Sequence, residues 1–358
     1  MPNGQGPHVL LTGANGFVAS HILWILIDRG YNVTATVRSQ EKAEDIIKTH
    51  PDWLGKVEFA IVADFTSAKP FDHLFDDSKT PFNYVIHTAS PVTFSVKDIQ
   101  KEIIEPAEMG TTAILIAAEN HCGAALKRFV LLGSAVSVLD SFEDISKPGK
   151  PYTEKNWNPV TKQAIEHKDN VLGYNVSKTR AERAAWNFMK EKSPTFDLVV
   201  INPDIITGPM THPISGPKSI NETNQFAIAN FIDGTHKEIE GVRFPFYHFV
   251  DVRDVARSHV DALENSAAAN QRILLISGLI TPQLVANYLR KNFPELRSRV
   301  PEGNPAQILP PGVCPTDWDT RVSLDILAKG TKDGKWEYVD LETSIIDSVK
   351  TMIKNRVI

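Results

Sequence analysis

Short apolar runs alternate with longer amphipathic stretches along the N-terminal half of the chain. Runs rich in β-branched residues predict strands, and apolar positions that recur every three or four residues predict helices. Continuous apolar runs are typical of parallel strands that helices cover on both faces. The predicted strands cover residues 8–12, 32–37, 57–63, 83–87, 128–132 and 198–201, and the predicted helices cover residues 17–29, 43–49 and 109–120.

This alternation predicts an α/β fold with a doubly wound parallel sheet and right-handed crossovers. After residue 202 the pattern changes, because residues 207–223 are rich in Pro, Gly, Ser and Thr and residues 301–315 are dense in proline. We expect one large domain over residues 1–205, to which residues 245–265 return. The smaller C-terminal lobe is expected to comprise residues 206–244 and 266–358.

Composition narrows the class of protein. The chain has 358 residues with 38 Lys and Arg against 43 Asp and Glu, a net charge of −5 that excludes a strongly basic nucleic-acid binder. Its two cysteines are too few for a disulfide-stapled scaffold and fit a reducing compartment. No apolar run approaches the roughly 20 residues of a membrane span. We therefore expect a cytoplasmic protein with neither nucleic acid nor membrane as partner.

The first predicted strand runs into a glycine-containing turn before the first predicted helix. Gly13 and Gly16 permit a tight turn, and the helix that begins there directs free N–H groups and the positive end of its dipole at an anion. Its position at the first strand favours a dinucleotide pyrophosphate over a plain strand-to-helix turn. The residues expected to contact the cofactor here are Thr12, Gly13, Asn15, Gly16, Phe17 and Val18.

The end of the second predicted strand indicates which dinucleotide binds. Arg38 stands where an acidic residue would bind the ribose 2′-hydroxyl of NAD, and Lys42 follows four residues later. Two cations suit the 2′-phosphate of NADP, and an arginine can hold it through two parallel hydrogen bonds. The alternative is a pair of solvated charges. NADPH is therefore the expected cofactor.

Two further strand ends contribute candidate cofactor contacts. Asp64 and Phe65 follow the third predicted strand. The Asp64 carboxylate would accept a hydrogen bond from the adenine amine or, alternatively, cap the next segment as an Asx turn. Thr88, Ala89 and Ser90 follow the fourth predicted strand, where small residues let the backbone run close to a cofactor.

A tyrosine and a lysine four residues apart are the strongest candidates for chemistry. On a helix Tyr174 and Lys178 share one face, and a lysine cation beside a phenol lowers the phenol pKa towards the range of proton transfer. Alone, this spacing is usually an ordinary helical face. Ser134 lies just past a predicted strand, where its hydroxyl can donate to a substrate carbonyl oxygen, and Ser137 is its rival. Together with the glycine turn, these residues predict a hydride-transfer site with Ser134, Tyr174 and Lys178 as the catalytic residues.

These motifs resemble the extended short-chain dehydrogenase/reductase family, in the branch of dihydroflavonol-4-reductase-like NADPH-dependent ketone, aldehyde and methylglyoxal reductases. The resemblance spans roughly residues 8–265, and it rests on residues 12–17, 37–38, 87–91, 134, 174, 178, 202–203, 208–209 and 249–256. It implies a Rossmann NADP-binding domain and a smaller substrate-binding lobe. It also implies that NADPH reduces an aldehyde or ketone to an alcohol, with Tyr174 as the proton donor.

The resemblance assigns roles to further residues. It makes segment 249–254 structural, and it places Gly133 where many relatives have a serine. Lys178 would also bind the nicotinamide ribose. The additional cofactor contacts that it implies are Pro203, Ile205, Ile206 and Ser219.

The substrate is a small-molecule carbonyl compound whose identity the sequence leaves open. Phe94 and the loop over residues 207–226 are expected to wall the pocket with Ser134 and Tyr174, and no histidine spacing indicates a metal. The alternatives are an NAD-dependent sugar-nucleotide epimerase or dehydratase, a 3β-hydroxysteroid or flavonoid-type dehydrogenase, and a non-enzymatic NADP-sensing regulator. Arg38 argues against the first and the tyrosine–lysine pair against the last. A monomer and a homodimer both remain open.

Overall fold

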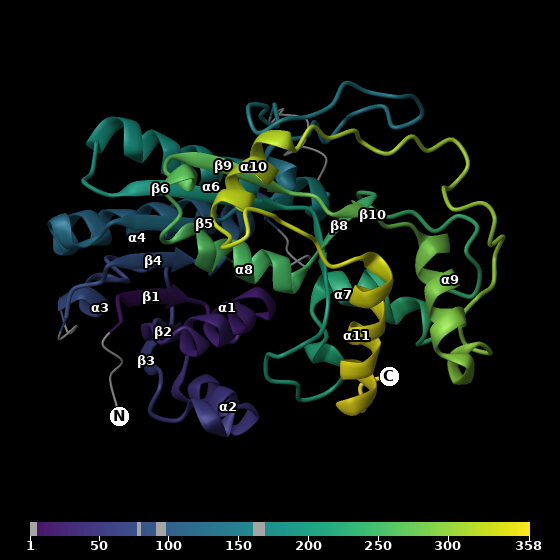
Figure 1. The fold of residues 1–358 in the computed structure, drawn as a ribbon, viewed down its shortest axis with the longest axis horizontal. Coiled ribbons are helices and arrows are strands. Elements are labelled where there is room, and N and C mark those ends of the chain that lie inside the picture. Colours follow the sequence, from purple (N-terminus) through teal and green to yellow (C-terminus); the bar gives the residue numbers. More distant parts are fainter. Residues whose placement is uncertain (1–5, 77–79, 91–97, 160–168) are drawn as a thin grey trace.

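A parallel sheet of seven strands dominates the computed structural model, which describes residues 6–76, 80–90, 98–159 and 169–358 (Figure 1). The strand order is β3-β2-β1-β4-β5-β6-β9, so the doubly wound Rossmann fold predicted from the sequence is confirmed. The strands are β1 (His8–Thr12), β2 (Asn32–Val37), β3 (Glu58–Ile61), β4 (Tyr84–His87), β5 (Arg128–Leu132), β6 (Asp197–Pro203) and β9 (Gln271–Leu275).

Helices cover both faces of this sheet, which explains the continuous apolar runs of its strands. Successive residues of β1 enter opposite cores: Leu10 packs with α4 (Glu105–Cys122), and Leu11 packs with α1 (Phe17–Asp28). The helices on the α4 side are α3 (Asp72–Asp76) and α6 (Asn170–Lys192), and those on the α1 side are α8 (Val252–Ala262) and α10 (Arg321–Lys329). A further helix, α2 (Gln40–Thr49), follows β2.

A second core belongs to the C-terminal part of the chain. It is built on a three-stranded sheet in the order β10-β8-β7, and it contains Phe231, Phe249 and Ile345. Figure 1 shows its helices on the side of the molecule away from β3. Its elements are β7 (Ile205–Thr207), α7 (Glu222–Ala227), β8 (His248–Asp251), β10 (Gly278–Leu279), α9 (Pro282–Asn292) and α11 (Leu341–Lys354).

The predicted domain boundary differs from the structure in two elements. Residues 266–358 are expected in the smaller lobe, but β9 pairs with β6 in the large sheet and α10 packs against β9. The reason is that the edge of β6 offers unpaired backbone groups to an apolar strand, wherever that strand stands in the sequence. The rest of the division into two lobes stays a prediction.

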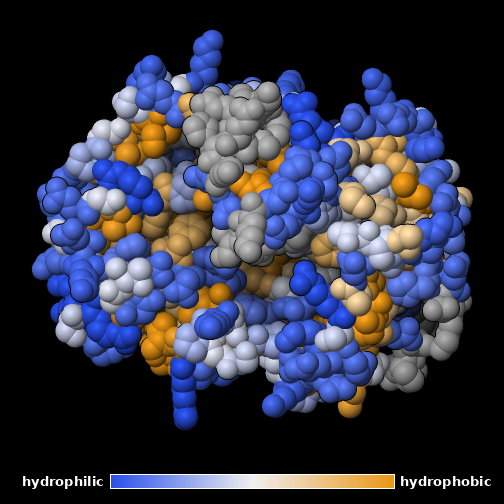
Figure 2. Space-filling view, turned by 180° about the vertical axis from the view of Figure 1, so that it is seen from behind, coloured by the Kyte–Doolittle hydropathy of each residue, from blue (hydrophilic) through white to orange (hydrophobic). Residues whose placement is uncertain are grey.

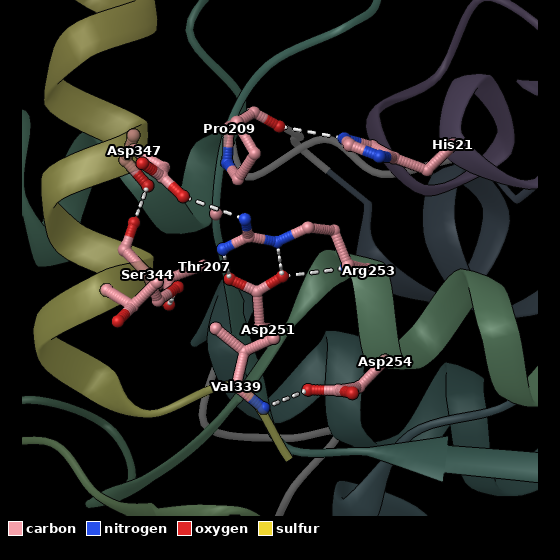
Figure 3. Close-up of polar contacts among 12 residues, drawn as sticks. His21, Thr207, Pro209, Asp251, Arg253, Asp254, Val339, Ser344 and Asp347 are labelled. Carbon is pink, nitrogen blue, oxygen red and sulfur yellow. Dashed lines mark hydrogen bonds and ion pairs between the residues drawn. The ribbon is translucent and has the colours of Figure 1, made fainter. Parts of the chain in front are cut away.

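An ion-pair network joins α8 to α11 (Figure 3). Arg253 binds both carboxylate oxygens of Asp251, at 2.8 and 2.9 Å, and its third nitrogen binds Asp347 at 2.7 Å. Asp254 accepts a hydrogen bond from the backbone amide of Val339 at 2.9 Å. These contacts hold the C-terminal segment against the start of α8, in line with the structural role expected for segment 249–254.

Within the ranges that the structure describes, no helix combines the length and the apolar character that a bilayer crossing requires.

Candidate active site

The strand order reverses between β1 and β4, and in such sheets ligands bind at the crevice where this reversal occurs. The Thr12 hydroxyl ties the two strand ends together, because it accepts hydrogen bonds from the amides of Thr88 and Ala89, each at 3.1 Å. Gly13 has φ +74°, and a Cβ there would lie 3.2 Å from the Cα of Ala89. A side chain at Gly13 would therefore both strain the backbone and crowd the floor of the crevice.

The start of α1 fits a pyrophosphate. Gly16 is its N-cap and offers no side-chain oxygen to the first amides, and the first turn holds no acidic residue. Phe17 and Val18 continue this turn into the helix, and Asn15 is half-buried before it. The helix thus presents open N–H groups and a positive dipole end beside Gly13.

The two predicted phosphate-binding cations lie at the start of α2. Arg38 is exposed and makes no ion pair with any described residue. Lys42 pairs instead with Asp45 at 3.1 Å, one helical turn onward. Since both partners of that pair are part-exposed, the pair is weak and Lys42 is free to exchange it for a phosphate.

Asp64 adopts the Asx-turn alternative. Its Oδ1 accepts hydrogen bonds from the amide and the hydroxyl of Thr66, at 2.8 and 2.6 Å, and these bonds lower its pKa. Its neighbour Phe65 packs against Gly110 of α4, where a Cβ would lie 2.9 Å from the ring. The structure therefore gives both residues a local partner, and their contact with adenine stays a prediction.

The remaining candidate cofactor contacts are spread over three places. Ala89 and Ser90 line a small cavity together with Lys178. Ser219 bonds the Ser215 hydroxyl at 2.9 Å within a tight turn of the loop after β7. Pro203 ends β6, and Ile205 and Ile206 follow in β7. Phe94 lies outside the described residues.

Ser134, Tyr174 and Lys178 come together at the end of β5. Ser134 and Tyr174 line the same cavity, of about 1380 Å³, and their hydroxyls are hydrogen-bonded to each other. Lys178 is buried, and its Nζ lies 5.9 Å from the centre of the Tyr174 ring and donates to the Leu132 carbonyl at 3.4 Å. Ser137, the rival hydroxyl, is fully buried and is not part of the cavity wall.

The electrostatics of this group differ from the sequence prediction. Burial raises the pKa of Tyr174 to about 12, and only the hydrogen bond with Ser134 opposes this effect. Burial also lowers the pKa of Lys178 to about 8, against a smaller opposite effect of Glu182. The expected lowering of the Tyr174 pKa is therefore wrong for this structure, because desolvation of the phenolate dominates and only the hydrogen bond with Ser134 acts in the expected direction.

The cavity has an apolar inner part and a charged outer part. Figure 2 shows hydrophobic residues inside a hollow on the face of the molecule turned away in Figure 1. Charged residues of segment 235–243 also line the cavity. The apolar side chains that line it are Val136, Val171, Ile205, Phe226, Val242, Phe244 and Phe246.

Comparisons with known proteins decide the family. A model described as the NAD dependent epimerase/dehydratase family matches residues 9–277. The chain belongs to this family. It is 38% identical over 292 residues to an uncharacterized oxidoreductase of Schizosaccharomyces pombe, with 81% of this chain and 83% of that one covered. It is 31% identical to a ketoreductase of Aspergillus niger, with 97% of each chain covered.

A solved structure agrees with this assignment. The yeast methylglyoxal/isovaleraldehyde reductase complexed with NADPH matches with a TM-score of 0.84 and 28% identity, over 98% of this chain and 99% of that one. The short-chain dehydrogenase/reductase resemblance stated from the sequence is therefore confirmed. The relatives of this protein within the family thus include a ketoreductase and a methylglyoxal/isovaleraldehyde reductase.

The structure leaves no room for a side chain at Gly133. A Cβ on Gly133 would lie 2.1 Å from Oδ1 of Asn202 and 2.9 Å from Cγ1 of Val200. The same Asn202 oxygen accepts a hydrogen bond from the amide of Ser134 at 2.8 Å and so positions Ser134. In this family member the asparagine occupies the space that a larger residue at 133 would need.

We expect Gly133→Ala to displace Asn202, to lower the free energy of unfolding by about 1–3 kcal/mol and to lower kcat because Ser134 loses its anchor. Urea unfolding and steady-state kinetics measure the two effects. Gly278→Ala is the matched control, because its Cβ would meet Phe249 at an ordinary 3.5 Å. Wild-type values for both stability and kcat in Gly133→Ala would contradict the proposed anchoring.

We expect Arg38→Glu to raise the KM for NADPH far more than the KM for NADH, because it sets a negative charge against the 2′-phosphate. The measurement is the ratio of kcat/KM for the two cofactors. Lys48→Glu, an equal charge change at an exposed position in the last turn of α2, is the control. An Arg38→Glu ratio equal to that of the control would show that Arg38 does not contact the phosphate.

Sequence reasoning missed two features of this site. Asp204 lines the cavity with the catalytic hydroxyls, and burial raises its pKa to about 7. Glu182, one turn beyond Lys178, is fully buried and pairs with Arg272 at 2.5 Å. A carboxylate directly after a buried strand is a signal for the first, but nothing local predicts the second.

Proposed function

We propose that this protein uses NADPH to reduce the carbonyl group of an aldehyde or ketone to an alcohol. The observation that carries this proposal is the grouping of three side chains at the end of β5: Ser134 and Tyr174 line one cavity, and the Nζ of Lys178 lies 5.9 Å from the centre of the Tyr174 ring. The enzyme class and the cofactor predicted from the sequence agree with the printed names of the relatives.

Ser134, Tyr174 and Lys178 have separate roles in the proposed reaction. NADPH, when bound, supplies the hydride to the carbonyl carbon. The hydroxyls of Ser134 and Tyr174 bind the carbonyl oxygen, and the high pKa of Tyr174 keeps its proton in place until the oxygen becomes negative. Lys178, with a pKa of about 8, is mostly protonated at neutral pH and stabilises the phenolate that remains.

The test is a panel of aldehydes and ketones assayed for NADPH oxidation, with chiral analysis of each alcohol. The proposal expects turnover of at least one carbonyl class, with NADPH preferred to NADH. The epimerase alternative would be favoured instead if the purified protein retained NAD⁺ tightly and none of the carbonyl compounds in the panel caused NADPH oxidation.

We infer a cytoplasmic location as well. Cys122 and Cys314 are both free thiols in the structure, and free thiols persist in a reducing compartment. Fractionation of cells that express the protein tests this inference, and light scattering of the purified protein decides between monomer and homodimer.

A further inference from the structure

Asp204 lies at the carboxyl end of β6, in the wall of the large cavity. It follows Pro203, the last residue of β6, and it lines the cavity with Ser134 and Tyr174. Asn202, two residues earlier and at most about 7 Å away along an extended chain, binds the amide of Ser134 at 2.8 Å. Asp204 therefore follows, two residues later, the side chain that positions Ser134, and it lines the same cavity as the Ser134 and Tyr174 hydroxyls.

One side of this carboxyl group lacks a donor. Its Oδ1 accepts the amide of Ile205 at 2.8 Å, and no other described residue donates to it. Asp204 is 9% exposed, and its second oxygen is not among the fully buried unpaired polar atoms of the described residues, so this oxygen is accessible from the cavity that Asp204 lines. Burial of the rest of the side chain raises its pKa to about 7. A largely buried carboxyl group with one protein donor and one open oxygen in a cavity wall is a candidate for binding a ligand.

The apolar surroundings of the Asp204 carboxyl group would let it distinguish between substrates. Val136, Ile205 and Phe226 are among the apolar side chains that line the cavity. A substrate that places a methyl group against Asp204 would leave the carboxyl group desolvated and unpaired. A substrate that places a hydroxyl group there would complete its hydrogen bonding.

We propose that Asp204 is a specificity-determining residue that accepts a hydrogen bond from a hydroxyl group within two carbons of the substrate carbonyl. The preferred substrates are then hydroxyketones and hydroxyaldehydes rather than plain alkyl ketones. This inference rests on the proposed carbonyl reduction, which it extends to a class of substrate.

The test compares pairs of ketones that differ by a hydroxyl group in place of a methyl group. These are hydroxyacetone against butanone, and 4-hydroxy-2-butanone against 2-pentanone, each with saturating NADPH. We expect the wild-type protein to favour the hydroxylated member of at least one pair in kcat/KM. In Asp204→Val that preference falls by about 10- to 100-fold, mainly through loss of the hydroxyketone and gain of the alkyl ketone.

Two further variants keep the result interpretable. Asp204→Asn preserves the shape of the side chain and an oxygen for the Ile205 amide, but it turns an N–H₂ group towards the cavity. This variant should also lose the preference for hydroxyketones. It keeps the test valid if Asp204→Val fails to fold. Glu295→Gln removes an exposed carboxylate that does not line the cavity and should leave the preference unchanged. The dissociation constant of NADPH, measured by its fluorescence without substrate, should change less than threefold in all variants.

Three outcomes would overturn the inference. They are an unchanged preference in both Asp204 variants, an equal loss of kcat/KM for both members of each pair, and a weakened NADPH affinity with the preference intact. In all three the wild-type protein still reduces ketones. Absence of any carbonyl reduction by the wild-type protein would instead refute the proposed function, so the two failures are distinguishable.

Discussion

Tyr174→Phe is expected to lower kcat for carbonyl reduction by about 10²–10⁴-fold. The substitution removes the hydroxyl that holds the carbonyl oxygen and supplies its proton, while the ring keeps its place on α6. Because Tyr174 lies on the cavity wall and bonds to Ser134, the loss should appear in kcat more than in the KM for NADPH. Steady-state kinetics with a carbonyl substrate identified in the panel measure both.

Tyr288→Phe is the matched control for this variant. Tyr288 lies on α9 and does not line the cavity, so its hydroxyl should be dispensable for turnover. Near-normal kcat in Tyr174→Phe, with correct folding by circular dichroism, would refute the assignment of Tyr174 as proton donor.

Arg272→Met is expected to lower the free energy of unfolding by about 3–5 kcal/mol. Arg272 on β9 bonds both carboxylate oxygens of Glu182 on α6, at 2.5 and 3.2 Å, and stacks over Trp157 with 3.7 Å to the ring centre. Glu182 is fully buried, so removal of the arginine would leave an unpaired charge in the interior. Urea unfolding followed by circular dichroism measures the loss.

A second substitution identifies the cause of this loss. Adding Glu182→Gln to Arg272→Met removes the orphaned charge and should restore part of the stability. Arg321→Met breaks an exposed pair with Asp319, at 2.6 Å, and should cost less than about 1 kcal/mol. Equal losses in Arg272→Met and Arg321→Met would contradict the view that burial makes the first pair important.

Much of the fold is predictable from local sequence. Buried parallel strands read as apolar runs whatever their partners, and the predicted strand over residues 128–132 corresponds to β5 without a change of boundary. The helix predicted over residues 109–120 is longer in the structure, because α4 begins at Glu105. The place of β9 was not predictable, because a strand carries no local mark of the sheet edge that it joins.

The candidate site also has features that local sequence predicts and features that it does not. The glycine turn and the Tyr174–Lys178 spacing are local patterns, and the structure places the first at the carboxyl end of β1 and the second beside the carboxyl end of β5, with β4 between these two strands. The sequence left Asp64 between an adenine contact and a turn, and only the position of Thr66 decided that it forms the turn. The pKa of Tyr174 was predicted in the wrong direction, because the spacing of a helix shows the nearby charge but not the burial.

The sequence by itself predicted the alternation of strands and helices over the first 200 residues, and it proposed a dinucleotide-binding turn, a cation for the 2′-phosphate and a tyrosine–lysine pair for proton transfer. The tertiary structure alone decided the protonation of that pair, the role of Asn202 beside Gly133 and the presence of Asp204 in the cavity wall. The physical reason is that periodicity and turn geometry depend on neighbours in the chain. Desolvation and steric exclusion depend on residues that folding brings together from far apart.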